Sequence, residues 1–195
     1  EKPEWRPMLR YLAELHARSI HPPTAHFPHP FEEIGPGYRV QSVAFGHIDL
    51  THARLDTVHA FPEETRLQTI NELAAQFDDG LLPGAIARLE KEAIYKPHRT
   101  FSPIWPVAVQ AYFDVTGDES ILPQCLDALV REIGWFEANR AVPGGGFYYL
   151  DIVNDTWESG MDEGVRYDAR PANIMACVDA CAHMFLAYDY AARWS

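Results

Sequence analysis

Residues 119–139 read ESILPQCLDALVREIGWFEAN and set the expected fold class. Apolar side chains recur in this run at three- and four-residue steps, which is the spacing of one face of an α-helix. The apolar residues are Leu122, Cys125, Leu126, Leu129, Val130, Ile133 and Phe136. The run therefore predicts a long amphipathic helix that packs one face against a core.

Helical patterns extend outward from this run in both directions. They cover residues 3–19, 43–60, 62–77, 103–116 and 171–193. Short and long connections alternate between them, which is typical of stacked αα-hairpins. Because Gly117 and Asp118 form a short link, the two helices that they join should lie antiparallel. We expect one all-α domain over residues 1–195, without a strong β-hairpin and with residues 147–150 as the candidate for a short strand.

The composition predicts a folded, soluble protein, and the charge argues against nucleic acid and membranes as partners. Hydrophobic residues make up 47% and aromatic residues 12% of the 195 residues, which is enough for a packed core. The formal net charge of -12 argues against nucleic acid and against an anionic membrane surface. The chain shows no run of ~20 apolar residues and no signal-peptide pattern. We expect a cytoplasmic protein, with a periplasmic or secreted one as the alternative.

The cysteines and histidines do not have the spacing of a metal site. Cys125, Cys177 and Cys181 each fall on an apolar helical stripe, so core packing is the expected role of all three. Several histidines lie in or near the Pro-rich segment 21–36, where a solvated loop is expected. We therefore expect neither a metal nor another cofactor.

A long loop, residues 143–170, separates the last two predicted helices. It contains three consecutive glycines, five aromatic residues and six acidic residues. The acidic residues are Asp151, Asp155, Glu158, Asp162, Glu163 and Asp168. Long loops on a rigid scaffold tend to be functional or disordered, and the aromatic content argues against disorder.

The residue types in this loop suit the cleavage of a glycosidic bond. That reaction needs one protonated carboxyl group, and an apolar, acid-rich setting keeps a carboxyl protonated by raising its pKa. Asp162 has such neighbours in Glu158, Glu163, Trp157 and Tyr167. Sugar binding also needs aromatic faces and polar groups. Residues of these types are Trp105, Trp157, Tyr148, Gln76, Arg39 and Arg166. From composition alone, a solvated acidic face and a core position for Trp105 remain alternatives.

Residues 157–168, WESGMDEGVRYD, resemble a known signature. The signature, E-S-G-[MW]-D-x-S-x-R-[WY], belongs to glycoside hydrolase families 37 and 63, which include trehalases, processing α-glucosidases and mannosylglycerate-hydrolase-like enzymes. The resemblance implies an (α/α)6 toroid and an inverting α-glycosidase with Asp162 as the general acid. It makes Arg166 a substrate-side arginine, with Trp157, Glu158 and Tyr167 as further substrate-binding residues.

Three shorter segments resemble the same families in the expected order. Residues 76–83, QFDDGLLP, resemble a Q-x-D-G-x-[IL]-P segment, and residues 102–106, SPIWP, resemble one that lines the sugar pocket. Residues 35–39, GPGYR, are similar to the trehalase P-G-G-R motif. The resemblance thus adds Gln76, Trp105 and Arg39 to the predicted substrate-binding residues.

The chain also departs from these families. No W-D-[ST] motif is recognisable in residues 43–47, and residues 163–165 read EGV where the families usually have a serine. A toroid of this type consists of six αα-hairpins and carries its general base in the second half. We therefore expect the chain to be about half of a toroid, its N-terminal half, completed by a C-terminal half or by a second chain.

Two other functions stay open at this stage. One is a non-catalytic carbohydrate-binding or interaction module on the same scaffold, and the other is a helical-repeat scaffold for protein partners. For the hydrolase, the expected substrates are oligosaccharides or small α-glycosides. These include α-glucosides of the trehalose type and α-mannosides such as mannosylglycerate.

Overall fold

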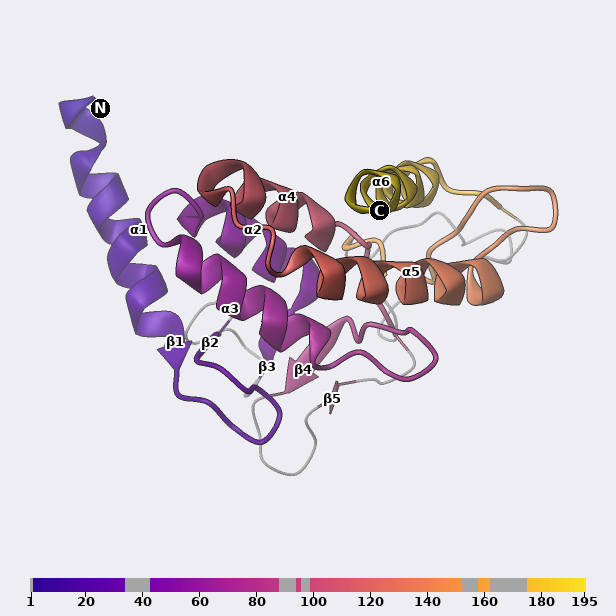
Figure 1. Ribbon diagram of the computed structural model, residues 1–195, viewed down its shortest axis with the longest axis horizontal. Coiled ribbons are helices and arrows are strands. Elements are labelled where there is room, and N and C mark those ends of the chain that lie inside the picture. The colour runs from indigo at the N-terminus through magenta and orange to yellow at the C-terminus, as the bar shows by residue number, and fades with distance from the viewer. Residues whose placement is uncertain (1, 34–42, 88–93, 96–98, 152–157, 162–174) are drawn as a thin grey trace.

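The computed structural model is mostly helical (Figure 1). It describes residues 2–33, 43–87, 94–95, 99–151, 158–161 and 175–195. The helices in these residues are a 3₁₀ turn η1 (Pro3–Trp5), α1 (Arg6–Ser19), α2 (His47–Thr57), α3 (Pro62–Leu73), α4 (Trp105–Thr116), α5 (Leu122–Asn139) and α6 (Val178–Trp194). The expected all-α fold class is confirmed.

Proline and glycine set several helix ends. Pro62 lies in the first turn of α3, and Pro106 and Pro123 lie in the first turns of α4 and α5, where the missing N–H costs no hydrogen bond. Gly117 ends α4 with a φ of 69°, a left-handed conformation that glycine adopts without strain. Such local signals explain why the predicted helices lie close to the observed ones.

Short strands are the main departure from the predicted secondary structure. β1 (Ile20–His21) pairs antiparallel with β2 (Phe31–Glu32), and β4 (Ala85–Ala87) pairs antiparallel with both β3 (Val43–Gly46) and β5 (Ile94–Tyr95). The sequence predicted no strong β-hairpin, and it gave no sign of these short antiparallel pairs. Strands of two to four residues are too short to show a clear alternation of apolar and polar residues.

Two predicted elements have different bounds in the structure. The predicted helix 43–60 is divided, because its first four residues form β3 and α2 begins at His47. The predicted helix 171–193 begins at Val178 in the structure. Residues 175–177 are not helical, Cys177 is extended, and residues 171–174 lie outside the described part. Of the predicted strand 147–150, only Phe147 pairs, in a single bridge with Ala141.

The main core lies between α3, α4, α5 and α6. Its most buried large side chains are Trp105, Tyr149, Phe136, Leu82, Leu129 and Met184. A smaller cluster of Phe27, Phe31 and Leu50 joins the N-terminal hairpin to α2. All three cysteines have free thiols, with Cys125 and Cys177 buried and Cys181 partly buried. The core-packing role predicted for the cysteines fits these positions.

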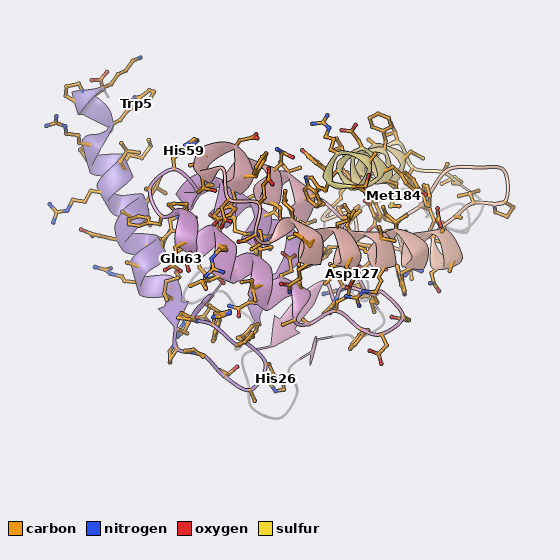
Figure 2. All side chains as sticks on the ribbon, viewed as in Figure 1. Trp5, His26, His59, Glu63, Asp127 and Met184 are labelled. Atoms are coloured by element: carbon orange, nitrogen blue, oxygen red, sulfur yellow. The ribbon has the colours of Figure 1, made fainter. Side chains whose placement is uncertain are left out.

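Helix α1 and helix α6 lie at opposite ends of the molecule in Figure 1. The N-terminal half of α1 extends away from the body, and Figure 2 shows Trp5 near its tip. Trp5, Met8 and Tyr11 are at least half exposed. At the other end, Val178 and Phe185 of α6 are 87% and 69% exposed. Both ends therefore present apolar side chains that the described part of the chain does not cover.

Buried polar contacts join α2 to α3 and, separately, α4 to α5. Arg54 of α2 is fully buried and lies 2.5 Å from Glu72 of α3, whose other carboxylate oxygen is 3.3 Å from His47. Burial raises the pKa of Glu72 to about 7 although the charge of Arg54 opposes the shift. On α5, Glu132 accepts a 2.7 Å hydrogen bond from the indole N–H of Trp105, and burial raises the pKa of Glu132 to about 8.

Glu132 should make the stability of the protein depend on pH. Its folded-state pKa of about 8 lies above the ordinary value of 4.5, so the stability that it contributes below pH 4.5 is lost as the pH rises through 8. Glu132→Gln keeps an acceptor for Trp105 and carries no charge. We expect this variant to lose less unfolding free energy than the parent protein between pH 6.5 and 8.5.

Chemical denaturation at several pH values measures this difference. The pKa of Glu72 is also raised, so Glu72 also makes the protein less stable as the pH rises. The plot of unfolding free energy against pH should therefore be less steep for Glu132→Gln than for the parent protein, but not flat. The titration of His47 does not interfere with this measurement. Burial lowers the pKa of His47 from 6.5 to about 3, so His47 changes the unfolding free energy mainly between these two pH values. Parallel stability curves for the two proteins over this range would contradict the prediction.

Candidate functional site

Three loop segments meet beside the N-terminal ends of α2 and α4. The segment 81–84 follows α3, the segment 99–104 precedes α4, and the segment 158–161 belongs to the long loop before α6. Gly84 joins the first two, since its N–H donates to the Arg99 carbonyl at 2.9 Å and its own carbonyl accepts from the His47 N–H at 3.1 Å. The Ser102 hydroxyl reaches the carbonyl of Glu158 at 3.3 Å. Segments that are distant in sequence thus form one loop cluster.

Glu158 is the central anchor of this cluster. Its side chain is fully buried and accepts two hydrogen bonds from Arg140, at 2.8 Å from Nε and 2.6 Å from Nη2. The backbone N–H of Leu150 donates to the same carboxylate at 2.8 Å. A two-point guanidinium–carboxylate contact restricts both distance and orientation. The start of the segment 158–161 is therefore held rigidly against the end of α5.

Arg140 itself is held from several sides. Its guanidinium lies over the ring of Trp135 at 4.7 Å and that of Tyr148 at 5.8 Å. Burial alone would lower its pKa, but the hydrogen bonds and charge of Glu158 outweigh burial and raise the pKa above its ordinary value. Arg140 therefore stays charged and stays in place.

The backbone after Glu158 is also fixed. The N–H of Ser159 donates to Asp151 at 3.0 Å, and the N–H of Met161 donates to the Ser159 hydroxyl at 3.1 Å. Gly160 adopts a φ of 76°, and a Cβ added there would lie 2.7 Å from Cδ1 of Ile48 on α2. The described segment ends at Met161, one peptide bond before Asp162.

Most of the predicted site residues cannot be placed. Those outside the described residues are Arg39, Trp157, Asp162, Arg166 and Tyr167. The roles predicted for them stay predictions. The structure does place Gln76, Trp105 and Glu158, and the Ser102 hydroxyl joins the loop that directly precedes Trp105 to Glu158.

The three placed residues make contacts within the protein. The Gln76 amide donates to the carbonyls of Gly80 and Ala128, at 3.0 and 2.9 Å, and so joins the turn after α3 to α5. Trp105 has no exposed surface and lies in the core, bonded to Glu132. The carboxylate of Glu158 is occupied by Arg140 and Leu150. These contacts are structural, and a direct contact of any of the three with substrate stays a prediction.

Sequence reasoning missed Arg140, Asp151 and Ser102. Arg140 follows a helix directly, where a basic residue is expected to complement the helix dipole, so nothing local distinguishes it. Its partner Glu158 is 18 residues away. Trp135 and Tyr148 were the available sequence signal for a buried arginine, because aromatic rings often stack on an arginine that is buried.

The buried acids of the core do not form a second site. Glu72 and Glu132 have strongly raised pKa values, which often mark catalytic acids. Both are almost fully buried, at 3% and 1% exposure, and so neither can reach a bound sugar. No group of three or more His, Cys, Asp or Glu in the described residues is placed to hold a metal ion. Within the same residues, no helix has the length and apolar character needed to cross a membrane.

The helices α2 to α6 and the loop cluster lie in a region whose sequence matches a glycoside hydrolase family. The family model of the mannosylglycerate hydrolase MGH1-like glycoside hydrolase domain matches residues 48–194, from the first turn of α2 to the end of α6. The chain belongs to this family, and the resemblance found in the sequence is confirmed. No curated protein matches the chain. Helix α1 and the β1–β2 hairpin lie outside the matched region.

The turn at Gly160 offers a test of how tightly the segment 158–161 is held. Gly160→Ala should cost about 1–2 kcal/mol for the left-handed backbone, plus the cost of contact with Ile48. Gly145→Ala is the matched control, since Gly145 has a φ of 97° but no atom within 4 Å of an added Cβ. Urea unfolding should show a larger loss for Gly160→Ala.

A second substitution tests the origin of that difference. Ile48→Val removes Cδ1, the atom nearest to the added Cβ. In the Gly160→Ala background it should restore part of the lost stability. Equal losses for Gly160→Ala and Gly145→Ala would mean that the segment moves freely away from α2.

Proposed function

We propose that the protein is an inverting, exo-acting α-glycoside hydrolase in which Asp162 is the general acid. The main support for this proposal is the set of contacts that hold residues 158–161, which we call the clamp. The four residues directly before Asp162 are held by the buried Arg140–Glu158 ion pair and by three hydrogen bonds between side chains and backbone groups. Gly160, in the left-handed conformation, lies close to Ile48. Such rigid support is what a catalytic group requires, because small errors in its position cost large factors in rate.

The proposed reaction breaks the bond between the anomeric carbon and the glycosidic oxygen. The Asp162 carboxyl gives its proton to that oxygen as the leaving alcohol departs. A water molecule attacks the anomeric carbon from the opposite face and gives its proton to a second carboxylate. The products are the free sugar, with inverted configuration, and the alcohol. Family membership supports the class of reaction, and the assignment of Asp162 is ours.

We propose α-glucosides and α-mannosides as the substrates. Arg39, Arg166 and Gln76 would bind sugar hydroxyls, and Trp157 and Tyr167 would provide aromatic faces for the ring. Trp105 and Glu158 would contribute indirectly, because their described contacts are with Glu132 in the core and with Arg140 in the loop cluster. A non-catalytic sugar-binding module is the alternative, and it differs by binding these sugars without cleaving them.

We propose that helices outside residues 1–195 complete the toroid. In the described residues, the five α-helices α2 to α6 lie in the matched region, and they correspond to somewhat less than half of the twelve helices of an (α/α)6 toroid. Val178 and Phe185 leave one face of α6 uncovered, which supports a further hairpin packing there. A C-terminal half of the same protein or a second chain would supply that hairpin, and the second catalytic carboxylate with it.

Removal of the proposed acid should abolish most hydrolysis. General acid catalysis typically contributes a factor of about 10²–10⁴, so Asp162→Asn should lower kcat by that order on alkyl α-glycosides. The substitution changes no described contact and should leave thermal unfolding unchanged. The measurement is the hydrolysis of a panel of α-glucosides and α-mannosides by the longest natural form of the protein.

Each result of this panel has a distinct meaning. Cleavage that Asp162→Asn abolishes supports the proposal and identifies the sugar. Cleavage that the variant retains would refute the role of Asp162. Sugar binding without any cleavage by the parent protein would favour the binding module.

The uncovered face of α6 gives a separate test of the completed toroid. Phe185 is 69% exposed in residues 1–195, so Phe185→Ala should change the stability of that chain little. In the longest natural form, a covered Phe185 should cost about 3–5 kcal/mol when truncated. Denaturant unfolding of both forms measures the two losses. Equal, small losses would show that nothing packs on this face.

A further inference from the structure

Arg140 occupies the junction between α5 and the long loop. Its backbone N–H donates to Phe136 at 2.7 Å at the end of α5, and its carbonyl accepts from the N–H of Tyr148 at 3.0 Å. The residue therefore belongs to the rigid helix and to the start of the loop at the same time. Any group that its side chain binds is located relative to the helical core.

All three guanidinium nitrogens of Arg140 take part in hydrogen bonds. Nε and Nη2 donate to Glu158, and Nη1 donates to the carbonyl of Asn139 at 2.9 Å. The side chains of Arg140 and Glu158 are only 10% and 0% exposed. With the rings of Trp135 and Tyr148 beside it, the guanidinium has one available orientation. A lysine cannot reproduce this arrangement, because it lacks both the planar fork and the stacking surface.

A buried ion pair of this kind is a weak source of stability. Apolar side chains of similar volume often replace such pairs without loss of stability, because desolvation offsets much of the attraction. Geometric specificity is the property that an apolar pair would lack. The position of Glu158, four residues before Asp162, indicates what that specificity serves.

We propose that Arg140 is a positioning residue for the general acid and that it acts through Glu158. The carboxylate of Glu158 fixes the start of the segment, and the contacts of Ser159 and Gly160 transmit that position to Met161. Arg140 touches neither substrate nor the reacting atoms in this scheme. The inference rests on the proposed function of Asp162 and extends it to a residue outside the recognised signature.

The variant Arg140→Lys tests this role through the leaving group. Protonation by an acid matters greatly for an alkyl leaving group and little for a phenol of low pKa, which departs without help. Displacement of a catalytic group by 1 Å can cost about 10²-fold. For Arg140→Lys we expect a loss of kcat of about 10- to 100-fold on an alkyl α-glycoside, a much smaller loss on the matching aryl α-glycoside, and little change in KM.

Two further variants separate positioning from folding. Arg131→Lys is the matched control, since Arg131 lies on the same helix in an exposed pair with Asp127 and should behave as the parent protein. The double variant Arg140→Met, Glu158→Leu replaces the ion pair with apolar side chains. It should fold, by thermal unfolding, and still show the selective loss on the alkyl substrate. An equal loss on both substrates, or no loss for Arg140→Lys, would overturn the proposal.

Hydrogen exchange tests positioning without any activity. Arg140→Lys should speed the exchange of the Leu150 and Ser159 amides, both of which are bonded within the clamp, and should leave the amides of α4 unchanged. Unchanged exchange at Leu150 and Ser159 would overturn the positioning role. If the parent protein cleaves no α-glycoside, the proposed function fails, and the exchange result still decides whether Arg140 holds the segment.

Discussion

The buried contact between Arg140 and Glu158 is the interaction on which the loop cluster depends. It joins the end of α5 to a segment 18 residues later, and the guanidinium and the Leu150 N–H together satisfy the buried carboxylate. A buried carboxylate without such partners would be strongly destabilising. The contact therefore has to form for the chain to fold in this way. It also holds Ser159 and Gly160 against Asp151 and α2.

Acidic residues in this chain have two different environments. Glu72 and Glu132 are enclosed by helices, where burial raises their pKa values and no substrate can approach. Asp151 and Glu158, the described acidic residues of the long loop, belong instead to the loop cluster beside the helix ends, and loops on a rigid scaffold commonly form sites. A raised pKa alone therefore does not locate the site. Access distinguishes a core acid from a catalytic one.

The two ends of the molecule suggest how the domain is organised. The family match begins at α2, so α1 and the β1–β2 hairpin lie outside the matched region. Helix α1 extends away from the body (Figure 1) and exposes Met8 and Tyr11, and α6 exposes Val178 and Phe185. Helix α6 buries Ala180 and Met184 on one face and exposes Val178 and Phe185, and a helix that is apolar on more than one face is typical of the interior of a larger assembly. Both ends are consistent with part of a toroid rather than with a closed bundle.

The sequence by itself determined the helical class and the approximate helix bounds, because apolar periodicity and the residues at the helix ends act locally. The residues at the helix ends are Pro62, Pro106, Pro123 and Gly117. The sequence also contained the family signature at residues 157–168. Only the tertiary structure decided that residues 43–46 pair as a strand, because a four-residue strand is defined by its neighbour β4. It also decided that Trp105 is a core residue and that Arg140 holds Glu158. Such contacts join residues 18 or more positions apart, and no local pattern encodes which distant partner a buried polar group will find.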